Sequence, residues 1–229
     1  MRATWPTRIA LAGIAATLLA GCGSSSDTPD LVNGKSMFTQ KCGSCHTLAR
    51  AQTQGKTGPD LDSAFQEALR VGMNRETVKG VVRDQISNVR RNSVMPKNLV
   101  KGSNARDVAA YVGFAASKPG KDTGALAQAG AAGATNGKDI FTASGCGSCH
   151  ALAKAGTNGN VGPKLDDLKT AAAKFGKQTK QTPQKYVEQS ILDPTAFTVP
   201  GFPKGVMPSY KGRLKPNQVQ ALVKYLLGG

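Results

Sequence analysis

The residues best suited to chemistry in this 229-residue sequence lie in a five-residue string that occurs twice. Cys42-Gly43-Ser44-Cys45-His46 recurs as Cys146-Gly147-Ser148-Cys149-His150, and the two strings contain four of the five cysteines and both histidines. In a Cys-x-x-Cys-His pattern the two thiols add to the vinyl groups of haem, and the adjacent imidazole binds the iron. The sequence therefore predicts two covalently bound haem c groups, with these cysteines as the attachment points and the two histidines as axial ligands.

Other uses of paired cysteines fit the sequence less well. A structural zinc site gathers its ligands within a few dozen residues, whereas Cys45 and Cys146 lie 101 positions apart. A thioredoxin-like dithiol needs a strand-to-helix setting, and no β-branched strand pattern precedes either pair. Simple disulfides would leave the histidine after each pair unexplained.

The N-terminus is typical of an export signal. An apolar run of 12 residues, Ile9 to Ala20, follows Arg2 and Arg8 and is too short to cross a bilayer. We assign residues 1–21 to a signal peptide. Export is consistent with haem attachment, because bacteria attach c-type haem outside the cytoplasm.

The end of this signal resembles the lipobox of bacterial lipoproteins. The string Leu19-Ala20-Gly21-Cys22 places Cys22 where such proteins are lipidated, and residues 22–32 then form a Gly- and Ser-rich tether. The alternative is an ordinary signal cleaved near Ala20, which leaves a free thiol. The lipobox predicts a protein anchored by lipid on the extracytoplasmic side of a bacterial membrane, periplasmic or at the cell surface.

The remaining chain divides into two copies of one unit. The segment from Cys42 to Asp62 aligns with Cys146 to Asp166 at a constant offset of 104, whereas the upstream Asn33-Gly34-Lys35 aligns with Asn136-Gly137-Lys138 at 103. The second copy thus carries one extra residue before its first cysteine. We predict domains at residues 33–118 and 135–229, joined by a Gly- and Ala-rich flexible linker at 119–134.

Each copy is expected to be mostly helical. Asn33 and Asn136 are candidate caps for a short helix before each string. Apolar residues at helical spacing predict three further segments and a start at Thr182-Pro183: Arg75 to Val89, Ala105 to Ala116, and Pro216 to Leu227.

With these features in place, both copies resemble class I cytochrome c domains. The resemblance implies an all-α fold of two tandem domains, each a small helical bundle around one haem. In that family a proline carbonyl accepts a hydrogen bond from the haem-binding histidine, and Pro59 and Pro163 each follow their histidine by 13 residues. Family members also pack an aromatic of the first helix against one of the last. The corresponding pairs are Phe38 with Tyr111 and Phe141 with Tyr225.

The resemblance also implies a methionine as the sixth iron ligand. Met207 is the only methionine after His150, and Met207-Pro208 matches the family's ligand loop. In the first copy Met37, Met73 and Met95 are available, and Met95-Pro96 repeats the Met-Pro pair just before the last helix. We predict Met95 and Met207 as ligands, which leaves no open coordination position and favours one-electron transfer.

The second copy has a further resemblance, to the haem c domain fused to subunit II of some caa3-type oxidases. It extends from Tyr186 through Pro194 and Met207 to Tyr210, but the copper motif and the two membrane-spanning helices of those subunits are absent from the sequence. A peroxidase-like dihaem enzyme, a haem sensor and a fixed subunit of a larger oxidoreductase complex remain alternatives to a free carrier.

Charge indicates the kind of partner. The sequence has 30 Lys and Arg residues against 14 Asp and Glu, a net charge of +16. Exported haem proteins rarely meet nucleic acid, so we expect acidic docking surfaces on redox partners, or anionic lipid headgroups. A generally solvated basic surface is the simpler alternative. The sequence therefore predicts an electron carrier between membrane or extracytoplasmic redox proteins of a respiratory chain, with no catalytic residues of its own.

Overall fold

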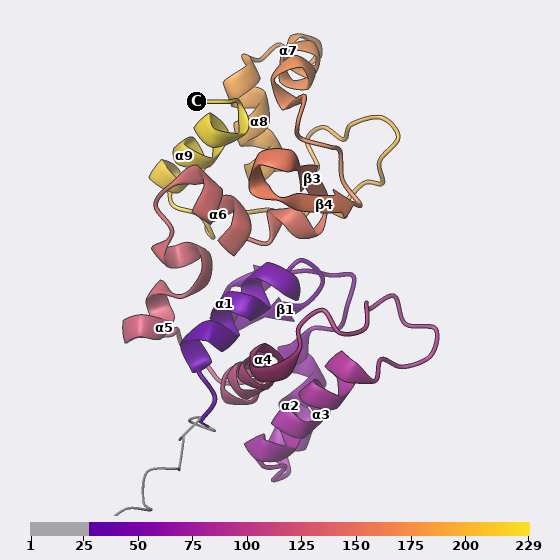
Figure 1. The fold of residues 1–229 in the computed structure, drawn as a ribbon, viewed down its shortest axis with the longest axis vertical. Helices are drawn as coiled ribbons and strands as arrows, with labels where there is room; N and C mark the ends of the chain where they lie inside the picture. The colour runs from indigo at the N-terminus through magenta and orange to yellow at the C-terminus, as the bar shows by residue number, and fades with distance from the viewer. Residues whose placement is uncertain (1–27) are drawn as a thin grey trace, which may run out of the picture.

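The computed structural model describes residues 28–229, so the predicted signal peptide and the lipidation site Cys22 lie outside the described residues. Figure 1 shows two helical halves, one coloured indigo to magenta and the other orange to yellow. The first half contains α1 (Leu31–Lys41), β1 (Thr47–Leu48), η1 (Ala49–Ala51), β2 (Thr53–Gln54), α2 (Leu61–Arg70), α3 (Arg75–Ser87) and α4 (Gly102–Ala115). The second contains α6 (Gly137–Ala143), η3 (Cys146–Ser148), β3 (His150–Leu152), η4 (Ala153–Ala155), β4 (Thr157–Asn160), α7 (Leu168–Gln178), α8 (Pro183–Leu192) and α9 (Pro216–Leu226).

The helix starts agree with the expected caps in the second copy but not in the first. The Asn136 side chain accepts a hydrogen bond from the Asp139 amide, and Thr182 caps α8 with Pro183 at its first turn. In the first copy Asp30 is the cap, so α1 begins at Leu31, before the predicted boundary at residue 33. Asn33 therefore lies inside α1, and its side chain donates a hydrogen bond to Asp107 of α4 at 2.8 Å.

Two helices, α2 and α7, were not expected from the sequence. They follow the Gly-Pro of each copy, and α2 begins where the Asp60 carboxylate accepts hydrogen bonds from the amides of Asp62 and Ser63. All residues of α2 are at least partly exposed. The apolar residues of α2 nevertheless recur at helical spacing, so the sequence carries a helical pattern there that the segments predicted above leave out: Leu61, Ala64, Phe65, Ala68 and Leu69.

The first and last helices of each copy cross at a glycine. An added Cβ at Gly34 would lie 2.1 Å from the Asp107 carbonyl oxygen of α4, and one at Gly137 would lie 2.2 Å from the Tyr225 Cβ of α9. Beside each crossing the expected aromatic pair is present, Phe38 with Tyr111 and Phe141 with Tyr225, both with ring centroids 6.4 Å apart. The absence of a side chain at the glycines lets the two helix backbones come together.

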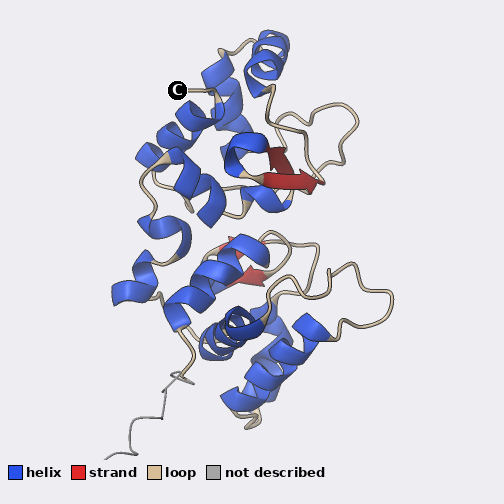
Figure 2. Cartoon of the chain, viewed as in Figure 1, coloured by secondary structure: helices blue, strands red, loops and turns tan. Residues whose placement is uncertain are grey.

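Strand content is small, as expected. Within the described residues the strands form two short antiparallel pairs, β1 with β2 and β3 with β4, which are drawn in red in Figure 2. Each pair begins at the end of a Cys-x-x-Cys-His string: β1 starts one residue after His46, and β3 starts at His150, which pairs with Asn160. The strand pairing therefore fixes the backbone conformation at and just after each histidine.

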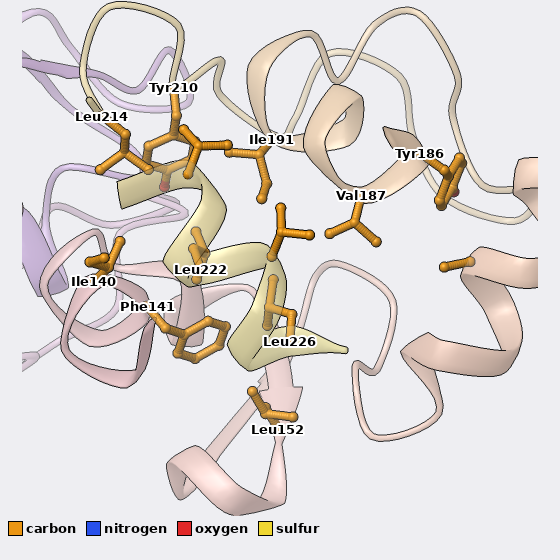
Figure 3. Close-up of a cluster of buried hydrophobic side chains, with 13 residues drawn as sticks. Ile140, Phe141, Leu152, Tyr186, Val187, Ile191, Tyr210, Leu214, Leu222 and Leu226 are labelled. Carbon is orange, nitrogen blue, oxygen red and sulfur yellow. The ribbon is translucent and has the colours of Figure 1, made fainter. Parts of the chain in front are cut away.

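The core of the second copy gathers around α9, as Figure 3 shows for Phe141, Leu222 and Leu226. Leu222 is 1% exposed and contributes to a cluster that also contains Val187 and Ile191 of α8. The first copy has an equivalent cluster around α4, built on Phe38, Leu48, Val108, Tyr111 and Val112. Two separate cores confirm two tandem helical domains.

The connecting segment differs from the flexible linker expected from its composition. It contains α5 (Gly124–Gln128) and η2 (Gly130–Gly133), which pack against α1. Buried polar contacts described below provide the order that its Gly- and Ala-rich sequence does not. Between residues 28 and 229, no helix combines the length and apolar character needed to cross a membrane.

Candidate functional site

Each Cys-x-x-Cys-His string lies at the end of the first helix of its copy. Cys42 caps the C-terminus of α1, its amide bonding to the Phe38 carbonyl at 2.8 Å, and the His46 amide bonds to the Cys42 carbonyl at 2.9 Å. In the second copy the string forms η3, in which the Cys149 amide bonds to the Cys146 carbonyl at 3.2 Å. These turns bring two thiols and one imidazole into a single short segment in each copy.

The glycine inside each string is required by packing against the hairpin that follows. An added Cβ would lie 2.4 Å from the Thr53 methyl at Gly43 and 2.3 Å from the Thr157 methyl at Gly147. Both threonine hydroxyls in turn accept a hydrogen bond from a backbone amide, that of Leu48 in the first copy. The string and the hairpin thus form one closely packed unit.

Both histidines are oriented by a proline carbonyl. The Nδ1 atom of His46 lies 2.9 Å from the Pro59 oxygen, and that of His150 lies 2.8 Å from the Pro163 oxygen. Since a carbonyl oxygen only accepts, Nδ1 carries the proton and donates it, which leaves the Nε2 lone pair available for a metal. Burial lowers the pKa of His150, although the bond to Pro163 acts in the opposite direction, and the neutral imidazole is the form that binds iron.

A glycine before each proline sets the plane of the imidazole. An added Cβ at Gly58 would lie 2.5 Å from the Cε1 atom of His46, and one at Gly162 would lie 2.5 Å from that of His150. The alignment of the two copies contains the Gly-Pro pair, and the clash of an added Cβ with the histidine ring explains why the first residue of the pair is glycine. The backbone itself forms one wall against the ring.

A largely apolar cavity opens beside the string of the second copy. Cys146, Cys149, His150, Pro163 and Met207 all line it. The rest of the lining is mainly aliphatic and aromatic, including Phe141, Phe175, Val187, Ile191, Phe197 and Leu222, several of which are labelled in Figure 3. A flat apolar macrocycle carrying two thioether links fits this donor set, and the predicted ligands of both faces are available in one cavity.

In the first copy the cysteine Cys42 and the predicted ligand Met95 belong to one apolar cluster. Cys42 is buried in it, and Met95 packs against it half-buried, as does Met37 of α1. The Nε2 atom of Gln85 lies 3.7 Å from the Met95 sulfur and donates to it weakly. This contact, which the sequence did not reveal, orients the thioether in a loop between α3 and α4.

The thiols do not have the character of a redox dithiol. Burial raises the pKa of Cys42 and of Cys146 to about 12 in each case. A disulfide-exchange site depends on a thiolate with a lowered pKa. Among residues 28–229, no group of three His, Cys, Asp or Glu side chains lies together as a metal-ion site.

Helical bundles that carry paired thiols beside a proline-backed histidine, next to an apolar cavity, define a c-type cytochrome. The chain belongs to the cytochrome c family, which matches residues 31–113 and 134–229. Membership of this family implies covalently bound haem c and a role in electron transfer.

The chain is similar to known cytochromes, each of which matches less than half of it. Cytochrome c6 of Anabaena variabilis is 35% identical over 97 residues, which cover 42% of this chain and 92% of that protein. Cytochrome c6 of a Nostoc species is 36% identical over 98 residues, 43% of this chain and 72% of that protein. The crystal structure of the c-type cytochrome SorU from Sinorhizobium meliloti matches 41% of this chain and 95% of its own, with 27% identity and a TM-score of 0.26.

Proposed function

We propose that this protein is a dihaem c-type cytochrome that transfers single electrons between membrane or extracytoplasmic partners of a respiratory chain. The observation that carries the proposal is the duplication of the complete site. Each copy has two thiols, a histidine whose Nδ1 faces a proline oxygen within 2.9 Å, and a Met-Pro loop before its last helix. Each copy thus has the residues to hold one haem.

The proposed axial pairs are His46 with Met95 and His150 with Met207. A thioether opposite an imidazole favours ferrous iron and raises the reduction potential relative to two imidazoles. Both coordination positions are then filled by the protein, so the chemistry that the haem supplies is outer-sphere transfer of one electron. The chain's own residues provide ligation, burial and orientation.

Haem content and ligation test this proposal directly. We expect a pyridine haemochrome assay and intact mass to give two haems per chain, and the ferric protein to show the thioether-to-iron charge-transfer band for both. Carbon monoxide should not bind the ferrous protein at neutral pH. A high-spin haem that turns over peroxide would instead identify the peroxidase-like alternative.

A surface for acidic partners surrounds the Met95 loop. Residues 88–101 contain no acidic residue, and the half-buried Met95 is flanked by exposed basic side chains, Arg90, Arg91, Lys97 and Lys101. Val94, 79% exposed, adds an apolar contact at the same place. Positive charge around an apolar centre steers an acidic partner and favours rapid dissociation at high salt.

Reduction of ferricyanide tests the role of this surface. Reversing Arg90 and Arg91 to glutamate should slow oxidation of the ferrous protein by this anionic reagent and flatten its dependence on ionic strength. Reversal of both Lys138 of α6 and Lys177 of α7, which are exposed, is the charge control, because it changes the net charge by the same amount. Equal effects at both places would show that net charge, rather than this loop, steers the partner.

The membrane attachment is also part of the proposal. Lipidation at Cys22 would hold the protein at the extracytoplasmic face, and the apolar run Ile9 to Ala20 before it supports export. Mass spectrometry of the protein isolated from membranes should show a diacylglyceryl-modified N-terminal cysteine. Cys22→Ser should release a soluble protein with both haems attached.

A further inference from the structure

The connecting segment, residues 119–134, is fastened to the first copy by a buried carboxylate. The side chain of Asp122 is 1% exposed and lies 3.0 Å from the Lys35 Nζ atom and 2.9 Å from the Arg50 guanidinium. The Tyr111 hydroxyl donates to the same carboxylate at 2.7 Å. Lys35, Arg50 and Tyr111 come from α1, η1 and α4, so a single residue of the connecting segment joins three elements of the first copy.

The other end of the segment is fastened to the second copy. Gln218 of α9 is buried, with 3% of the residue exposed. Its side-chain amide donates to the carbonyl oxygens of Ala131 at 2.8 Å and Ala134 at 2.7 Å. Between the two ends, Lys35 also donates to the Leu126 carbonyl at 2.7 Å. The segment therefore has fixed partners in both copies, and these buried polar contacts oppose independent motion of the domains.

The two copies also touch directly, at the string of the second copy. The Ser148 hydroxyl donates to the Gln40 carbonyl at 2.9 Å, at the C-terminal end of α1. Gly145 has a φ of +74°, and an added Cβ there would lie 2.8 Å from the Thr39 oxygen and 3.0 Å from the Gln40 oxygen. Gln40 is two residues before Cys42, so each string adjoins this contact. Helix α1 contacts both α6 and η3, and Figure 1 shows α6 next to α1.

The contact brings the strings of the two copies together. Ser44 of the first string lies in the lining of the cavity that contains Cys149 and Met207 of the second copy.

We propose that the contact of Gly145 and Ser148 with the end of α1, held in place by the connecting segment, makes the chain one two-centre unit in which electrons pass internally between the copies. The inference rests on the proposed function, in which both strings carry haem. One electron moves in each event: the centre of one copy is oxidised from ferrous to ferric as the other is reduced, and no bond or proton is exchanged. The unit can thereby accept an electron at one copy and release it from the other.

Gly145→Ala tests the contact, because its side chain would press on two carbonyl oxygens of α1. Gly156→Ala is a matched control: Gly156 has a similar φ of +69°, but an added Cβ would meet no atom within 4 Å. Both substitutions carry comparable backbone strain. Only the first should separate the copies.

The readout is the coupling between the copies, measured as the rate at which an electron redistributes between the two haems after rapid partial reduction, once a haem count has established two haems per chain. We expect a redistribution phase that is independent of protein concentration in the wild type and in Gly156→Ala, and a much slower one in Gly145→Ala. Fewer than two haems would overturn the proposed function itself. Two haems without a concentration-independent redistribution phase in the wild type would overturn only the internal transfer.

A second variant covers the case in which Gly145→Ala does not fold. Ser148→Asp places a carboxylate against the Gln40 carbonyl, at the negative end of the α1 dipole, and should open the contact by repulsion. Ser148→Ala, which removes only the hydroxyl, is its control and should retain more coupling. Full coupling in Ser148→Asp would contradict the proposal.

Discussion

Replacing Asp122 by asparagine should destabilise the first copy strongly. The substitution keeps the size of the side chain but removes the negative charge that faces Lys35 and Arg50. Both cations are themselves buried, with side chains 5% and 9% exposed. The asparagine amide would also direct donor hydrogens toward groups that are donors themselves.

The size of the effect follows from which contacts survive. Removing one partner of a buried ion pair costs about 3–5 kcal/mol because a buried charge is left uncompensated. Lys35 would retain the Leu126 carbonyl, and Arg50 would retain the carbonyls of Pro119 and Lys121. These remaining acceptors place the loss near the lower limit, about 3 kcal/mol. In a domain of this size that corresponds to a fall in Tm of roughly 12 °C or more.

The same carboxylate predicts a pH dependence. Burial alone would raise the pKa of Asp122, but hydrogen bonds from Tyr111, Lys35 and Arg50 together hold it below its ordinary value. A lowered pKa in the folded state means that the stabilisation is present above about pH 4, the ordinary Asp range, and is lost as the pH falls through the folded value. The Asp122→Asn protein should lack this part of the acid sensitivity.

Thermal unfolding of the haem-loaded protein, followed by far-ultraviolet circular dichroism at neutral and acid pH, measures both effects. Asp167→Asn is the control, because Asp167 is exposed and its side chain makes no cap hydrogen bond. We expect the transition of the first copy to move and that of the second to stay. A loss below about 1 kcal/mol, the range of a surface ion pair, would refute the reasoning.

Three further predictions concern the sites and the helix crossing. Met207→Ala should remove one of the two thioether-to-iron bands and lower one midpoint potential while both haems stay attached; unchanged spectra would refute that ligand assignment. Gly58→Ala should push the His46 imidazole from its plane, since the new Cβ would lie 2.5 Å from Cε1, and produce a high-spin component in the electron paramagnetic resonance spectrum of the first copy. Gly34→Ala should lower the free energy of unfolding, whereas Gly80→Ala, whose Cβ would meet nothing within 4 Å, should leave it equal or raise it by about 0.5–1 kcal/mol; similar results for the two helical glycines would show that the crossing tolerates a side chain.

Much of each site could be predicted because its residues are close in sequence or repeat at equal spacing. The Pro59 and Pro163 carbonyls lie where the two 13-residue intervals indicated, within hydrogen-bond distance of the histidine rings. Met207 lines the cavity of its own string, although its coordination of iron stays a prediction. The short spacing of the site residues and its repetition in both copies together leave very few possible arrangements for such a site.

Contacts between distant segments were not predictable in this way. Asp122 is a single acidic residue in a Gly- and Ala-rich segment, and its sequence neighbours do not indicate that Lys35 and Arg50 will enclose it. The composition of residues 119–134 therefore predicted flexibility, while three-dimensional packing supplies order through one carboxylate and the Gln218 amide. Composition indicates the flexibility of a segment without tertiary contacts, and buried polar contacts with the rest of the protein can order the same segment.

The one irregularity in the alignment of the copies lies at their contact. The second copy has an extra residue before its first cysteine, and α6 ends at Ala143, so that Gly145 turns the backbone through a left-handed conformation. In the first copy α1 continues to Lys41 and ends directly at Cys42. The extra turn lets Gly145 and Ser148 meet the carbonyls that end α1, and the Ser144 carbonyl behind it accepts from the Tyr210 hydroxyl at 2.9 Å. The residue that breaks the repeat thus gives the second copy a turn that fits the first copy, which two copies without the extra residue would not provide.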